Sequence, residues 1–105
     1  MTYYKIDERR LPIKCSLEEY KEWDKDDKFE LLHRVAKDEM NGYEISTVFL
    51  GLDHSFDSKK QLLFETMIFG EGAGDQYQTR CSTWDEALEM HIKAIEYVKR
   101  GCVDE

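Results

Sequence analysis

Three side chains that can do acid–base chemistry follow one apolar stretch of the sequence. Residues 46–56 read STVFLGLDHSF, so an apolar, β-branched run reaches a glycine and is soon followed by Asp53, His54 and Ser55. A carboxylate beside an imidazole is a common general acid–base pair, and both groups bind metal ions. The same residues are also typical of a turn, because Asp and Ser side chains bond nearby backbone N–H groups. Three interpretations follow: a turn, a ligand-recognition loop, or a catalytic or metal site.

Two further polar residues stand in otherwise apolar patterns. Glu65 interrupts the run LLFETMIF, where a carboxylate is costly to bury unless it is paired with a residue such as His or Arg. His91 lies on the apolar stripe of the last predicted helix. Each also has a structural interpretation: Glu65 facing solvent, and His91 bonded within the core. Contact of His91 with Glu65 or with Asp53 would create an acid–imidazole pair in a half-buried cleft.

The elements that must position these residues include two helices with clear starts. Ser16 with Glu19, and Thr83 with Glu86, have the spacing of a capping box. The second of these helices runs to Gly101, which suits the position after a helix end. Its apolar residues follow a spacing of three and four, and this predicts one buried stripe. The stripe contains Trp84, Ala87, Leu88, His91, Ala94, Ile95 and Val98.

Strands account for most of the remaining pattern. Asn41-Gly42 is a strong hairpin signal and predicts antiparallel pairing of the segments on either side. Residues 29–40 fit neither period cleanly, and the turn favours a strand in their second half. We therefore predict an α+β fold in one domain of residues 1–105: a mostly antiparallel sheet of about three to five strands, with two helices packed on it and the C-terminal helix longest. The other predicted strands are residues 2–7, 12–16, 43–52, 61–70 and 77–81.

Composition restricts the partners. The 23 acidic and 15 basic residues give a net charge of −8, which disfavours nucleic acid and attracts basic protein surfaces. Cys15, Cys81 and Cys102 form no C-x-x-C pair, and free thiols fit a reducing compartment. The sequence shows neither a signal-peptide core nor the roughly 18 apolar residues of a membrane span. We predict a cytoplasmic protein without a membrane or nucleic-acid partner.

No cofactor or metal is predicted. A metal site usually needs three or four ligands, and the adjacent Asp53 and His54 supply two. The GEGAG segment at residues 70–74 lacks the Lys-Ser/Thr ending of a phosphate-binding loop and contains an acid. It is interpreted as a flexible turn.

Three motifs together resemble a family of small proteins encoded by bacteriophages and prophages. They are STVFLGLDHSF, LLFETMIFG and STWDEALEMH, and the similarity extends over residues 2–98, including the YYKID start. The resemblance implies phage origin and an intracellular setting in the bacterial host. No activity is assigned to the family, so no catalytic residue carries over from it.

Two functions are compatible with these observations. The first is a non-enzymatic protein that binds a host protein with a basic surface, such as a host-defence or host-takeover factor, using the GLDHSF and GEGAGD segments as contact loops. The second is a protein that sequesters a small ligand, or a metal-dependent hydrolase, whose Asp/His/Glu cluster converges within about 4–6 Å. We favour the first because no complete catalytic set is present, and homo-oligomerisation stays open. The predicted ligand- or partner-binding residues are Asp53, His54, Ser55, Glu65 and His91.

Overall fold

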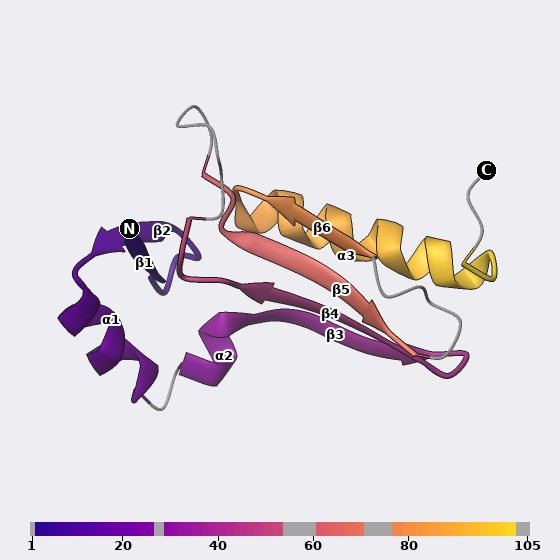
Figure 1. The fold of residues 1–105 in the computed structure, drawn as a ribbon, viewed down its shortest axis with the longest axis horizontal. Coiled ribbons are helices and arrows are strands. Elements are labelled where there is room, and N and C mark those ends of the chain that lie inside the picture. The colour runs from indigo at the N-terminus through magenta and orange to yellow at the C-terminus, as the bar shows by residue number, and fades with distance from the viewer. Residues whose placement is uncertain (1, 27–28, 54–60, 71–76, 103–105) are drawn as a thin grey trace.

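The α+β class is confirmed by a computed structural model, which describes residues 2–26, 29–53, 61–70 and 77–102. Strands β3 to β6 form a four-stranded antiparallel sheet in chain order, and β1 and β2 form a separate hairpin (Figure 1). The C-terminal helix is the longest, as predicted. The elements are β1 (Tyr3–Ile6), β2 (Pro12–Cys15), α1 (Leu17–Asp24), α2 (Phe29–His33), β3 (Arg34–Met40), β4 (Tyr43–Phe49), β5 (Phe64–Phe69), β6 (Gln78–Cys81) and α3 (Trp84–Lys99).

The ambiguous segment before the Asn41-Gly42 turn contains both structures. Its first half is the short helix α2 and its second half is β3, so the described residues contain three helices where two were predicted. Asn41 and Gly42 have φ angles of 53° and 84°, the left-handed conformation that a tight two-residue hairpin requires. The turn pairs Met40 with Tyr43, and a bulge between Arg34 and Ala36 shifts the register at the far end.

Helix α3 covers one face of the four-stranded sheet (Figure 1). Side chains alternate between the two faces of a strand, and on β4 the buried set is Ile45, Thr47 and Phe49. These residues pair in register with Ile68, Thr66 and Phe64 of β5. The alternate residues of β4 are half-buried.

Helix α3 begins at the predicted capping box and buries a narrower stripe than predicted. The Thr83 hydroxyl accepts the Glu86 N–H, and the Glu86 carboxylate accepts the Thr83 N–H. Leu88, placed on the stripe by its spacing, is 40% exposed because it lies at the margin of the contact. The buried residues of α3 are Ala87, His91, Ala94 and Val98. Within the described ranges, no helix is long and apolar enough to cross a membrane.

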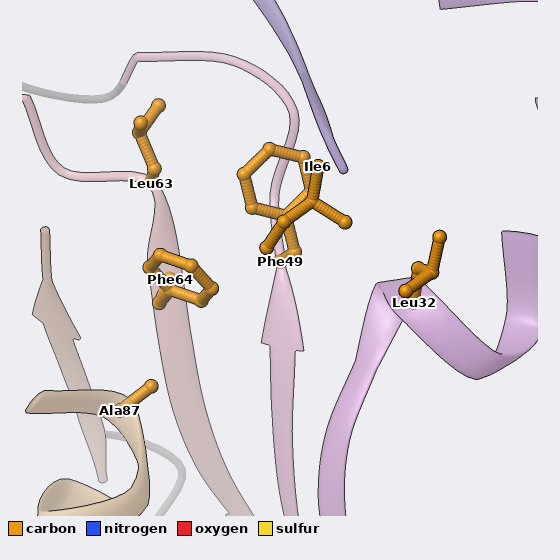
Figure 2. Packing of buried hydrophobic residues seen from close by; sticks show 6 residues of the cluster. All are labelled: Ile6, Leu32, Phe49, Leu63, Phe64 and Ala87. Carbon is orange, nitrogen blue, oxygen red and sulfur yellow. The ribbon is translucent and has the colours of Figure 1, made fainter. Parts of the chain in front are cut away.

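The largest cluster of buried side chains lies where the sheet meets the N-terminal elements. Figure 2 shows Phe49 and Phe64 from adjacent strands, with Ala87 of α3 on one side and Leu32 of α2 on the other. The rings of Phe49 and Phe64 are 5.3 Å apart. A second cluster, farther along α3, includes Ile45, Ile68, Ala94 and Val98.

The N-terminal hairpin joins the sheet just beyond the end of β4. The Tyr4 N–H donates to the Gly51 carbonyl over 2.8 Å, and Tyr3 forms an isolated bridge with Leu52. Gly51 has a φ angle of 78°, and a Cβ there would lie 2.5 Å from the Tyr20 ring of α1. The glycine of STVFLGLDHSF is therefore required both by its backbone conformation and by the close approach of α1.

Candidate functional site

Asp53 bonds to the backbone across the base of its loop, nine residues on, rather than within a local turn. Its carboxylate accepts a hydrogen bond of 3.1 Å from the Leu62 N–H, and this bond links the two ends of the segment between β4 and β5. His54 and Ser55 lie outside the described residues, as does most of the GEGAGD segment. The interpretation of Asp53 as a backbone-bonding residue is therefore supported.

Glu65 is a buried carboxylate with a basic partner. It is 8% exposed and lies on β5 directly opposite Arg80 of β6. The Arg80 Nε donates to Glu65 Oε2 over 2.9 Å, and the Gln78 side-chain amide donates to the same oxygen over 2.7 Å. The interpretation of Glu65 as an acid engaged with an arginine is confirmed, and the solvent-facing interpretation is wrong.

His91 is a core histidine with both ring nitrogens bonded. Its Nε2 lies 2.7 Å from Asp38 Oδ2, and its Nδ1 lies 2.7 Å from Thr47 Oγ1. Thr47 is in turn 2.5 Å from Thr66 on the neighbouring strand. The acid that His91 meets is Asp38, which was not among the predicted residues.

The predicted convergence of Glu65 and His91 is wrong. Thr66 and Thr47 face α3, where they bond with each other and Thr47 bonds with His91. Glu65 precedes Thr66 in the same strand, and successive side chains of a strand point to opposite faces. The sheet therefore separates Glu65 and Arg80 from His91 and Asp38, and a single Asp/His/Glu cluster does not form.

The Asp38–His91–Thr47 network has the order of a catalytic triad but not its accessibility. A triad needs a hydroxyl that substrate can reach and an acid that stays sheltered. Here Thr47 is fully buried, whereas the side chain of Asp38 is 52% exposed. Hydrogen bonds can run in one direction, from Thr66 to Thr47, to His91 Nδ1, and from Nε2–H to Asp38. The network satisfies buried polar groups under α3 and presents no reachable nucleophile.

Electrostatics in the N-terminal elements favour ionised acids and a protonated thiol. The Leu11 N–H lowers the pKa of Asp7 below its ordinary value, aided by Arg9. Hydrogen bonds from Ser16 lower the pKa of Glu19. Burial raises the pKa of the Cys15 thiol, which disfavours the reactive thiolate. In the described part of the chain, no group of three or more His, Cys, Asp and Glu side chains is arranged to hold a metal ion.

One signal in the sequence could have located Asp38 and Thr47, which sequence reasoning missed. A two-residue turn at Asn41-Gly42 fixes the register, which places Asp38 opposite Ile45 and on the same face. Two strand positions farther along that face is Thr47. Counting back from the turn therefore brings an acid close to a buried hydroxyl, although it does not reveal that His91 joins them.

Comparison with protein-family models, with curated proteins and with solved structures found no match to this chain. The function is therefore argued from the arrangement of the chain's own side chains.

Proposed function

We propose that this chain is a small acidic protein of bacteriophage type that acts without catalysis, by binding a host protein through a basic surface of that protein. Host-defence and host-takeover factors are the partner classes that this proposal covers. The observation that carries it is helix α1, which presents acids to solvent and buries no side chain of its own.

Helix α1 presents an acidic face to solvent and packs on the core through half-buried side chains such as Trp23. Lys21 is the one base among its eight residues, and a capping box closes its first turn. A short helix gains most of its stability from burying an apolar face, so a helix with no buried residue is unusual. The acids of α1 are Glu18, Glu19, Glu22 and Asp24.

Charge adds a long-range component to such a contact. A net charge of −8 attracts a basic surface during diffusion and repels nucleic acid. The complete burial of Thr47 supports a non-enzymatic role, because a substrate cannot reach the hydroxyl of the Asp38–His91–Thr47 network. The motif resemblance to phage and prophage proteins supports the host setting. Three free thiols, Cys15, Cys81 and Cys102, are compatible with a reducing host cytoplasm.

The test is capture of partners from a bacterial host lysate with the tagged protein. We expect a partner that is retained at low salt and released at high salt, because screening weakens contacts between exposed charges. The doubly neutralised variant Glu18→Gln/Glu22→Gln should lose this partner. Both residues are exposed, so the change leaves the core intact.

The matched control is Glu89→Gln/Glu96→Gln on the exposed side of α3, which removes the same charge. It should retain the partner. Equal loss of the partner with both variants would show a response to net charge alone. Capture that is independent of salt and unaffected by the α1 variant would contradict the proposal.

A further inference from the structure

Two adjoining hollows lie between α1 and the β1–β2 hairpin. One, of about 490 Å³, is lined by residues of β1 and α1, and the other, of about 370 Å³, extends toward β2 and α2. They share Lys5, Trp23 and Asp26 and so adjoin one another, and together they are here termed the N-terminal groove. Its combined size is in the range of protein sites that hold a side chain or short peptide.

The groove has an apolar and aromatic floor. Trp23 is half-buried, and its ring packs against Phe29 at 4.8 Å and Phe49 at 5.8 Å, which anchors it to the core. Ile6 and Leu32 are buried beneath the second hollow, and Ile13 at its edge is 41% exposed. An aliphatic side-chain stem can therefore lie on this floor without displacing any element.

The rim of the groove is acidic. Glu18, Glu22 and Asp26 follow a four-residue spacing, so they line one side of α1 and its continuation. Like charges at this spacing destabilise a helix, and a cation placed between them relieves that repulsion. Glu18 and Glu22 have no hydrogen-bond or ion-pair partner for their carboxylates among the described residues. Lys5 is the single base among the lining residues of both hollows.

We propose that the N-terminal groove binds an extended basic segment of a partner protein, with an arginine side chain seated against Trp23. The guanidinium pairs with the Glu18–Glu22 row, and the stem lies on the apolar floor. Arginine suits the site better than lysine because its planar guanidinium forms two parallel hydrogen bonds with a carboxylate and stacks on aromatic rings. This inference rests on the proposed function and specifies the surface and the chemistry of the partner.

The test uses three synthetic hexapeptides: Gly-Arg repeated three times, its citrulline counterpart and its lysine counterpart. The ¹⁵N-labelled chain of residues 1–105 has two indole N–H signals, from Trp23 and Trp84. Trp84 serves as an internal reference because Arg10 already lies 5.0 Å from its ring. We expect the arginine peptide to shift the Trp23 signal and leave Trp84 unchanged. Citrulline, which has the same shape without the charge, should cause no shift.

Variants locate the contact. Glu18→Gln/Glu22→Gln should weaken binding of the arginine peptide about tenfold, which is the effect expected from the loss of two exposed ion pairs. The control Glu89→Gln/Glu96→Gln should change the affinity less than about twofold. Equal binding of the lysine peptide would overturn the choice of arginine.

Failure of this inference can be told apart from failure of the proposed function. Peptide binding that shifts Trp84 or the amides of α3, with equal weakening by both double variants, would overturn the groove as the site and leave a general attraction for bases. Peptide binding in the groove with no partner captured from the host would support the groove and contradict the proposed function.

Discussion

Helices α1 and α3 begin with the same capping-box signature but differ in how much of their surface is buried. Each has a hydroxyl cap and a glutamate three residues later, with both reciprocal hydrogen bonds formed. Helix α3 buries four residues against the sheet, whereas α1 buries none. Local capping therefore specifies where a helix starts but not what it contacts. We therefore distinguish a packed half, made of α3 and the sheet, from an N-terminal half, in which α1 keeps its acids exposed while Trp23 attaches it to the core.

The largest effect should come from truncating a side chain under α3. Phe64 is fully buried and contacts Phe49 and Trp84, so Phe64→Ala should lower the free energy of unfolding by about 3–5 kcal/mol. Leu17→Ala, on α1 and 38% exposed, should stay within about 0.5 kcal/mol. Urea unfolding measures both. Similar losses for the two variants would break the division between the halves.

The polar network under α3 should give the next largest effect. Thr47→Val keeps the shape but leaves His91 Nδ1 without its partner, at a cost of about 1–3 kcal/mol. Combining it with His91→Leu should cost less than the sum of the two single changes, because the pair is coupled. Ser46→Ala, on the opposite face of β4, is the control with a small effect. Additive losses in urea unfolding would show that the hydroxyl and the imidazole act independently.

The two caps test the comparison directly. Ser16→Ala and Thr83→Ala each remove a hydroxyl that accepts the N–H three residues on, a loss of about 1 kcal/mol for the helix. For Thr83 this loss should appear in the global free energy of unfolding. For Ser16 it should appear as faster amide hydrogen exchange within α1, because a helix with no fully buried residue is expected to open before the core does. A global loss from Ser16→Ala would show that α1 is part of the cooperative unit.

The smallest effect concerns pH at the junction between the halves. Burial lowers the pKa of His33, which stacks on Phe29 at 4.9 Å, although Glu30 acts in the opposite direction. The unfolded chain then binds a proton more readily than the folded one, so stability should fall as pH drops below the ordinary histidine pKa of about 6.5. Comparing wild type with His33→Gln in urea unfolding from pH 5 to pH 8 isolates this contribution. An identical pH profile would contradict it.

The β3–β4 hairpin and both caps were predictable because they depend on short-range signals. Asn41-Gly42 and the two capping boxes act within a few residues, and the structure contains all three. Segment 29–40 was ambiguous because a five-residue helix and a seven-residue strand follow each other without a glycine or proline between them. Neither period can be recognised in so few residues.

The candidate site was less predictable because it depends on which face each strand presents. Glu65 and Thr66 are neighbours in sequence, and one residue of register decides which of them meets His91. That register is set between β4, which ends at Phe49, and β5, which begins at Phe64, and these positions are too far apart in the sequence for a two-residue turn to fix the pairing. The N-terminal groove was missed for a similar reason. It forms between α1 and the β1–β2 hairpin, and their packing leaves no periodic trace in the sequence.

Gly51 connects the two halves in a way that reaches beyond its own turn. It is the point where the end of β4 touches the Tyr20 ring, and Tyr20 and the groove residue Trp23 lie on the same helix. A methyl group there would meet the outer end of the Tyr20 ring, so this ring, which contacts Trp23, would have to move. Under the proposed function, a substitution at Gly51 would therefore alter the aromatic side of the groove while every carboxylate of the rim stays the same.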